Sequence, residues 1–112
     1  MSDASVPEQV YEAAADRTLR ELQDRIMDLT DGPESDLEGG ILTIEFEDGV
    51  KFVINSHRAA RQIWMAADRS AWHFDYRHGE ERWVAPKTGE ELWSAVDAVL
   101  SRKLGRPIHL AR

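Results

Sequence analysis

An acidic stretch stands out in the sequence. Residues 28–40 read DLTDGPESDLEGG and carry five carboxylates, with no lysine or arginine among them. Like charges this close repel one another, so the stretch is either a solvated acidic surface or a place where a positive partner binds. Carboxylates without histidine or cysteine are hard oxygen donors, which suit Mg²⁺, Ca²⁺, Mn²⁺ and iron. The spacing matches no enclosed calcium loop, so we expect any ion to be held weakly and released easily.

Residues 7–29, which lead into this stretch, have the period of an amphipathic helix. Their apolar side chains fall on one stripe, and four carboxylates lie on the opposite face at positions i, i+3, i+7 and i+10. The last two would stand at the helix C-terminus, where the macrodipole disfavours anions. Gly32 and Pro33 are expected to end the helix. The four carboxylates are Glu21, Asp24, Asp28 and Asp31.

The following segment, GGILTIEFEDGVKFVINS at 39–56, is typical of a β-hairpin. A two-residue turn at Asp48-Gly49 would set apolar side chains opposite polar ones. A three-residue loop over 47–49, with Gly49 left-handed, instead gives one fully apolar face. This one-sided alternation indicates a sheet that is covered on one face only. The cross-strand pairs predicted on the covered face are Leu42 with Ile54, Ile44 with Phe52 and Phe46 with Val50.

The rest of the chain alternates in the same way and then becomes helical. Strands are predicted in RQIWMAA at 61–67, AWHFDYR at 71–77 and ERWVAP at 81–86. Residues 88–91, TGEE, have the pattern of a capping box that opens a second helix, and Gly105 is expected to end it. Two terminal helices can cover one sheet face. The predicted fold is therefore α+β: a two-layer sandwich with an antiparallel sheet of five to six strands, in a single domain over residues 1–112.

Trp64 is a second feature with functional potential. Its neighbours on the same strand face, Gln62 and Ala66, are not typical of a core, whereas Ile63 and Met65 on the other face are. A tryptophan on the uncovered face is either an anchor for a partner protein or a cross-strand aromatic packed on neighbouring strands. The sequence leaves both alternatives open.

A weaker metal candidate consists of His73, Asp75 and His78. The first two share one face of a predicted strand, and the third follows three residues after Asp75. Histidine is a common metal ligand, but one on a sheet face is more often a surface or hydrogen-bonded residue. We therefore expect hydrogen bonding rather than metal ligation here.

Composition limits the remaining function classes. The chain has 112 residues, no cysteine and a net charge of −7, so disulfides, thiolate ligands and cysteine nucleophiles are excluded. Residues 1–48 hold fourteen acidic and three basic side chains (−11), and residues 49–112 hold seven and eleven (+4). The acidic half should repel nucleic acid. No apolar run approaches the roughly 18 residues of a membrane span. Because MSDASVPEQV contains no secretory or transit segment, we expect a cytoplasmic protein.

Taken in order, these pieces resemble the frataxin family, most closely its bacterial, CyaY-type members. The string GGILTIEFEDGVKFVINSHRAARQIWMAADRSAWHFDY at 39–76 contains LTIEFEDGVKFVIN, QIWMA and HFDY in the family's order and spacing. The acidic first helix and the closing TGEELW helix also fit, so the resemblance covers nearly the whole chain. One departure is Ser70-Ala71, which stands where the family usually has two glycines. We therefore expect a different turn before HFDY.

The resemblance implies a function in iron–sulfur cluster assembly. Ferrous and ferric iron would be bound weakly and reversibly, and the protein would be a monomer without iron that can oligomerise under iron load. The partners implied are the cysteine desulfurase and its scaffold protein. The role is either iron donor or regulator of that complex, and a regulator would need no iron. A ferroxidase is a third alternative, but the sequence shows no buried carboxylate–histidine centre, so we expect no enzyme.

The family's functional positions carry over to particular residues of this chain. Asn55, Gln62 and Trp64 would face the partner proteins from the sheet. The acidic residues that would bind iron are Glu21, Asp24, Asp28, Asp31, Glu34, Asp36, Glu38 and Glu45. On this interpretation, the repulsion within residues 28–40 is retained because a cation or a basic desulfurase surface relieves it.

Overall fold

Two helices and six strands make up the part of the chain, residues 6–110, that the computed structural model describes. The helices are α1 (Glu8–Met27) and α2 (Leu92–Leu104). Two short 3-10 turns, η2 (Arg58–Ala60) and η3 (His78–Glu80), connect strands. The strands are β1 (Glu34–Glu38), β2 (Ile41–Glu45), β3 (Lys51–His57), β4 (Gln62–Ala67), β5 (Ser70–Arg77) and β6 (Arg82–Val84).

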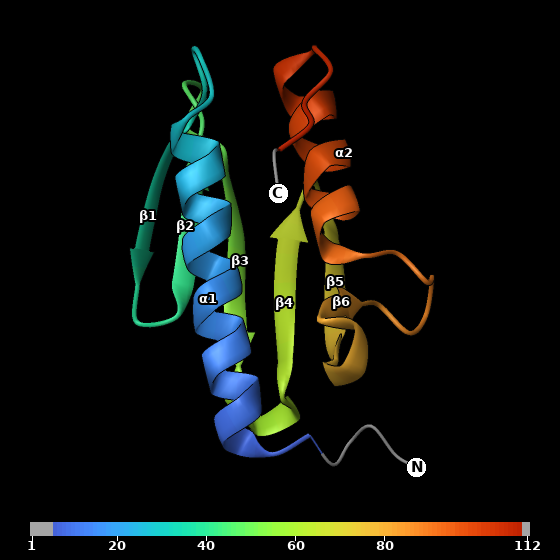
Figure 1. Ribbon diagram of the computed structural model, residues 1–112. Helices are drawn as coiled ribbons and strands as arrows, with labels where there is room; N and C mark the ends of the chain where they lie inside the picture. The colour runs from blue at the N-terminus through green and yellow to red at the C-terminus, as the bar shows by residue number, and fades with distance from the viewer. Residues whose placement is uncertain (1–5, 111–112) are drawn as a thin grey trace.

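The six strands form one antiparallel sheet, and they follow one another in sequence order. Figure 1 shows α1 and α2 on the same face of this sheet, with α1 near the β1 edge and α2 near the β6 edge. We call the other sheet face, which neither helix covers, the open face. The architecture is the predicted two-layer α+β sandwich, with six strands.

The β2–β3 hairpin has the register that the apolar pattern predicts. Leu42 lies opposite Ile54 and Ile44 opposite Phe52, and all four side chains are buried. The Phe46 amide donates to the Val50 carbonyl at 2.9 Å, which closes a three-residue loop over 47–49. In this loop φ of Gly49 is +87°, a conformation that glycine adopts without a steric penalty. The predicted register is therefore confirmed, but Val50, which was predicted on the covered face, is exposed.

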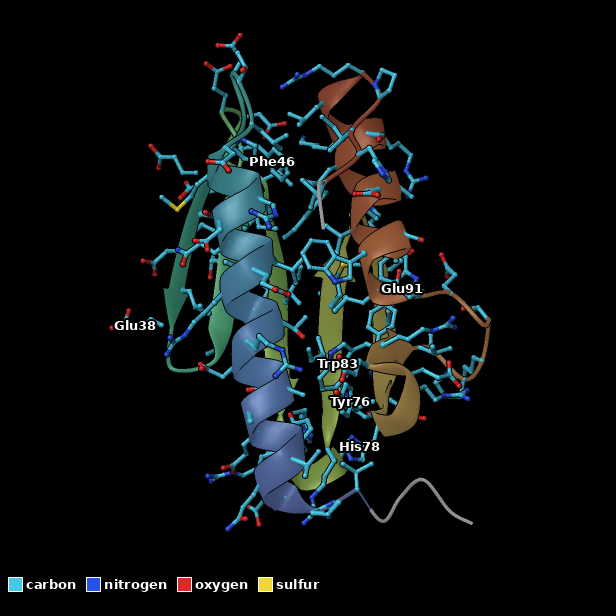
Figure 2. The ribbon with its side chains drawn as sticks, in the orientation of Figure 1. Glu38, Phe46, Tyr76, His78, Trp83 and Glu91 are labelled. Atoms are coloured by element: carbon cyan, nitrogen blue, oxygen red, sulfur yellow. The ribbon has the colours of Figure 1, made fainter. Side chains whose placement is uncertain are left out.

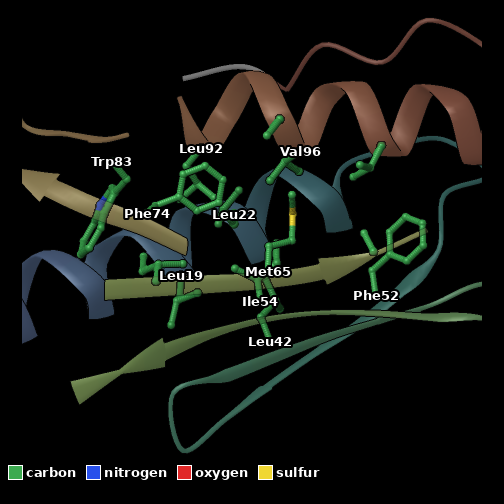
Figure 3. Packing of buried hydrophobic residues seen from close by; sticks show 14 of the residues in the cluster. Leu19, Leu22, Leu42, Phe52, Ile54, Met65, Phe74, Trp83, Leu92 and Val96 are labelled. Carbon is green, nitrogen blue, oxygen red and sulfur yellow. The ribbon is translucent and has the colours of Figure 1, made fainter. Parts of the chain in front are cut away.

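Apolar side chains from both helices and the sheet fill the space between the layers (Figure 3). Trp83 of β6 lies under α1, where its indole nitrogen donates to Thr18 Oγ1 at 3.0 Å. Tyr11 packs edge-on against Trp83, with 5.9 Å between the ring centroids. The one buried polar side chain among the described residues, that of Thr18, thus has a partner. The covered face is committed to packing, which leaves functional chemistry to the outer surfaces.

The first helix ends earlier than the sequence pattern predicts. Its last residue is Met27, Asp28 is the C-cap, and Asp31 has a left-handed φ of +53°. Asp28 and Asp31 therefore do not continue the helical face of Glu21 and Asp24, and the predicted extent to Leu29 is wrong. The turn after the helix is held from the other end of the chain, since the guanidinium of Arg106 donates to the Thr30 carbonyl at 2.6 Å.

The second helix begins later than predicted. Its N-cap is Glu91, whose carboxylate accepts from the amides of Trp93 and Ser94 at 3.1 and 3.2 Å. Thr88 instead accepts from the Glu90 amide at 3.2 Å within the preceding turn. The predicted capping box at 88–91 is therefore wrong, because a glutamate immediately before the helix satisfies its free amides instead. Gly105 ends the helix as predicted, with φ of +70°.

Ser70 and Ala71, for which a different turn was expected, belong to β5, and the turn between β4 and β5 precedes them. Ala67 pairs with Ser70, so the turn consists of two residues, Asp68 and Arg69. Both have positive φ, 54° and 66°, which non-glycine residues adopt only at some energetic cost. Asp68 also pairs with Arg102 of α2 at 3.0 Å, which ties this turn to the helix layer.

An ion pair fixes the β2–β3 loop to the end of α2. The Lys103 ammonium donates to the Asp48 carboxylate and lies 5.5 Å from the centre of the Phe46 ring. The hydrogen bond from Lys103, followed by that from the Val50 amide, holds the pKa of Asp48 below its ordinary range. A carboxyl whose pKa is lowered by folding stabilises the folded state above its unfolded pKa of about 3.9. That contribution is lost as the pH falls through the lower, folded value.

Asp48→Asn should therefore lower the thermal unfolding midpoint at pH 7, and the difference from wild type should shrink below about pH 4. Thermal unfolding followed between pH 7 and pH 3 measures this. Glu47→Gln is the matched control, because the neighbouring Glu47 has no ion pair within residues 6–110. An Asp48→Asn curve parallel to wild type down to pH 3 would contradict the assignment.

Candidate functional site

Gly39 and Gly40 turn the chain back after β1 and place the acidic stretch on the sheet. Glu38 pairs with Ile41 across them, and both glycines have positive φ, 59° and 78°. This is a two-residue hairpin turn that requires left-handed residues. A Cβ at Gly40 would also lie 2.6 Å from Ser56 Oγ. The strand before this turn has little apolar alternation, which explains why the sequence pattern did not predict it.

Four carboxylates occupy the open face at the β1 edge of the sheet. Glu34, Asp36 and Glu38 are exposed and alternate with half-buried residues on the helix side. Glu34 lies directly opposite Glu45 of β2, which lies opposite Lys51 of β3. Figure 2 shows Glu38 at the outer edge of the sheet, pointing away from the molecule. We call Glu34, Asp36, Glu38 and Glu45 the sheet group.

The other predicted iron ligands lie along the second half of α1 and in the loop after it. Glu21 and Asp24 are exposed on the helix, away from its buried stripe. Asp28 follows as the C-cap and Asp31 lies in the loop, and both are exposed. We call these four residues the helix group. The two groups together form the acidic ridge, which runs from the surface of α1 to the open face of the sheet.

The ridge carboxylates differ from most other acidic side chains of the molecule. Elsewhere, Glu12 pairs with Arg58 at 2.6 Å and Asp16 with Arg20 at 3.2 Å. Within residues 6–110, none of the eight ridge carboxylates forms an ion pair or a side-chain hydrogen bond. Across the same residues, no three acidic or histidine side chains converge on one point as a metal site. Among the described residues, the ridge is therefore a set of exposed carboxylates without ion pairs and not a preformed cage.

Neutralising one ridge carboxylate should stabilise the fold. Asp28 stands at the C-terminus of α1, four residues after Asp24, so it repels both the helix dipole and a like charge. We expect Asp28→Asn to raise the free energy of unfolding by about 0.3–1 kcal/mol at low salt. Urea unfolding of Asp28→Asn and wild type at 10 mM and 500 mM NaCl measures the difference in the free energy of unfolding. This difference should be smaller at the higher salt concentration. A loss of stability would show that Asp28 acts as a specific cap.

Trp64 occupies the middle of the open face between two histidines. Its indole ring is stacked on His57 of β3 on one side and on His73 of β5 on the other, with centroid distances of 3.8 and 4.2 Å. The interplanar angles are 13° and 15°, so the three rings form one stack across neighbouring strands. Of the two alternatives for Trp64, this geometry is that of the cross-strand aromatic. A contact between the exposed ring edge and a partner remains compatible with it.

The three predicted partner-facing residues lie together on the sheet. Asn55 is directly opposite Trp64, and Gln62 accepts a hydrogen bond from the Trp64 indole at 2.7 Å. Sequence reasoning missed His57 as a member of this group. The sequence could have predicted it, because His57 follows Asn55 by two residues and both side chains therefore lie on the same face of β3.

The metal candidate His73, Asp75 and His78 does not form. His73 is stacked on Trp64, and Asp75 accepts from Gln62 at 2.8 Å. His78 lies in the turn after β5, 6.0 Å from the ring centroid of Tyr76. The three side chains have separate partners, and only Asp75 has the hydrogen bond that was expected for them.

The chain was compared with known protein families and solved structures, and it matches one family. A family model of the frataxin-like domain matches residues 4–106. The iron-sulfur cluster assembly protein CyaY of Thioalkalivibrio sulfidiphilus is 37% identical over 98 residues, which cover 86% of this chain and 92% of that protein. CyaY of Ralstonia nicotianae is 34% identical over 100 residues, 86% of this chain and 87% of that one. The chain therefore belongs to the frataxin family, in its bacterial, CyaY-type branch.

Solved structures agree on the fold. A frataxin from Psychromonas ingrahamii superposes with a TM-score of 0.85 over 96% of this chain and all of that one, at 22% identity. Yeast frataxin superposes with a TM-score of 0.66 at 27% identity, over 87% of this chain and 85% of that one. In the described part of this chain, neither helix has the length and apolar character needed to cross a bilayer.

Proposed function

We propose that this protein acts in the cytoplasm in iron–sulfur cluster assembly, as a binding protein and not as an enzyme. It binds iron weakly and reversibly on the acidic ridge and docks on the cysteine desulfurase and its scaffold. Its bacterial relatives are named as cluster assembly proteins, which supports the process. The observation that carries the proposal is the ridge itself: eight exposed carboxylates, none of which has an ion pair with another of residues 6–110.

The spacing of the ridge carboxylates supports weak binding at several positions. Residues two apart on β1 are separated by about 7 Å along the strand, which is farther than two residues directly opposite each other on neighbouring strands. Glu34 and Glu45 face each other across β1 and β2, where Cβ atoms are about 4.5–5.5 Å apart. This pair can share one ion, with water completing the coordination. We therefore assign Glu34 and Glu45 as the preferred iron position, and an exposed two-carboxylate site should bind at micromolar affinity or weaker.

The ridge contains more carboxylates than are needed to bind one ion, which favours a second role for this surface. It extends from α1 across the following loop to β2. A charged surface of this size attracts a basic protein surface and speeds its association. We therefore propose that the ridge also docks the desulfurase, so that bound iron and the basic partner compete for the same charge. A regulator that docks without delivering iron uses the same surface, and it is the alternative function.

Reconstituted cluster assembly tests the proposal. The rate of cluster formation on the scaffold, with desulfurase, cysteine and ferrous iron, should change as this protein is added. Neutralising the sheet group (Glu34→Gln, Asp36→Asn, Glu38→Gln and Glu45→Gln) should require at least tenfold more protein for the same change. Glu80→Gln with Glu81→Gln is the control, because these exposed carboxylates lie outside the ridge. A wild-type protein that leaves the rate unchanged at any concentration would refute the proposed function.

A further inference from the structure

A chain of side-chain hydrogen bonds on the open face ends at Trp64. The indole nitrogen of Trp64 donates to Gln62 Oε1 at 2.7 Å, and Gln62 Nε2 donates to Asp75 Oδ1 at 2.8 Å. Gln62 and Asp75 are directly opposite each other on β4 and β5. Three residues from two strands therefore form one relay, and Trp64 is its terminal member.

The direction of this relay is set by Asp75. An ionised carboxylate can only accept hydrogen bonds, so the Gln62 side chain must turn its NH₂ group towards Asp75. Its carbonyl oxygen then points to the Trp64 indole, which can only donate. With another residue at position 75, the Gln62 amide could rotate and leave the indole without an acceptor. Asp75 thus determines which group Gln62 presents to Trp64.

Apart from the hydrogen bond from Gln62, no hydrogen bond or ion pair within residues 6–110 explains why a carboxylate stands at position 75. The cross-strand neighbour of Asp75 on β6 is the apolar side chain of Val84. A half-buried carboxylate beside a valine is not accounted for by packing or by the fold's other ion pairs.

We infer that Asp75 is a positioning residue for Trp64 and acts through Gln62. The inference rests on the proposed function, docking on the desulfurase and its scaffold, and on the family resemblance, which implies that Trp64 faces those partners. The two imidazoles fix the tilt of the indole ring and the relay fixes its rotation, so the ring is oriented before a partner arrives. Because the indole N–H is used inside the protein, Trp64 offers a partner its apolar ring edge and no hydrogen bond. A preoriented contact loses less conformational entropy on binding.

Exchange of the indole hydrogens with solvent, followed by NMR on the isolated chain, tests the relay. Asp75→Ala should accelerate exchange of the Trp64 indole hydrogen at least tenfold. The Trp83 indole, which is bonded to Thr18 in the core, is an internal control and should be unaffected. Gln62→Glu alone should also accelerate exchange at Trp64, because two carboxylates would then face each other.

The double variant Gln62→Glu with Asp75→Asn is the decisive case. It keeps the net charge and reverses the central hydrogen bond: the new amide at position 75 donates to the new carboxylate at position 62, whose other oxygen still accepts from Trp64. Exchange at Trp64 should return to within about twofold of wild type. Unchanged exchange in Asp75→Ala would overturn the inference. Accelerated exchange that the double variant fails to reverse would do so as well, because it would indicate lost packing.

Binding to the desulfurase–scaffold complex is the second readout. Asp75→Ala should weaken binding at least fivefold, and the double variant should restore it, while thermal stability changes little in either. Binding restored together with indole protection supports the inference, and binding that stays at the wild-type level in Asp75→Ala overturns it. The exchange measurement needs no partner. A failure of Trp64 to contact the complex would therefore be seen in Trp64→Ala binding and distinguished from a failure of the relay.

Discussion

Replacing Trp64 by alanine should weaken binding to the desulfurase–scaffold complex by roughly 30-fold, the effect of losing a tryptophan at the centre of an interface. Trp64 is oriented by stacking against His57 and His73, so its truncation removes a large preformed apolar contact. Isothermal titration of the complex with each variant measures the change. Iron binding should stay at the wild-type level, because Trp64 lies three strands away from β1 in the sheet order.

The matched control is Trp64→Phe, which keeps a flat ring in the histidine stack but removes the indole N–H. Its binding should lie between those of wild type and Trp64→Ala. Equal binding by wild type and Trp64→Ala would contradict the partner contact. Trp64 would then be only the cross-strand aromatic that its stacking geometry describes.

Charge reversal at the sheet group should have an effect of similar size on desulfurase binding. Glu34→Lys with Glu45→Lys changes the local charge by four units at two exposed positions. We expect desulfurase binding at low salt to weaken at least tenfold. The remaining binding should depend much less on salt, because salt acts by screening exposed charges beyond about 10 Å at 0.1 M, and the variant lacks the attraction that is screened. Binding measured from 20 to 300 mM NaCl gives both quantities.

Glu80→Lys with Glu81→Lys makes the same change in net charge on the connection between β5 and β6. It should weaken binding far less, because the attraction depends on where the charge lies. Equal losses in the two double variants would mean that overall charge, and not the ridge, governs association.

Local periodicity determined most of the fold. The β2–β3 register follows from which side chains would meet: only the three-residue loop places Leu42 and Ile44 with their partners under the helices. The two terminal helices are also placed correctly relative to the sheet. Gly105 ends α2 as predicted, but the end of α1 and the start of α2 are not placed correctly, because side-chain contacts outside the apolar period hold both. Arg106 holds the turn after α1, and the carboxylate of Glu91 caps α2.

The sequence predicted which carboxylates make up the acidic ridge, but not how they are arranged on the helix, the loop and the sheet. The sequence assigns Asp28 and Asp31 to a helical face, whereas the chain leaves the helix at Met27. The signal for the missing strand was Gly39-Gly40, since two adjacent glycines favour a two-residue hairpin turn. A two-residue turn at Gly39-Gly40 predicts a strand before it that pairs with β2, with Glu34 opposite Glu45.

Contacts between side chains of β4 and β5 were beyond the sequence pattern. Period two puts Gln62 and Trp64 on one face, as it does His73 and Asp75. It does not state which residue of β4 meets which residue of β5. The two-residue turn at Asp68 and Arg69 sets that register, and with it the relay from Asp75 to Trp64.

Iron binding by the ridge is the central claim, and ferrous titration of the isolated chain without oxygen, followed by NMR line broadening, tests it most directly. Wild type should bind at micromolar affinity or weaker, with the first signals to broaden at Glu34 and Glu45. Glu34→Gln with Glu45→Gln should weaken the tightest step at least fivefold, and Glu80→Gln with Glu81→Gln should leave it unchanged. Broadening elsewhere, with the same affinity in all three proteins, would contradict the claim and leave the ridge a solvated acidic surface.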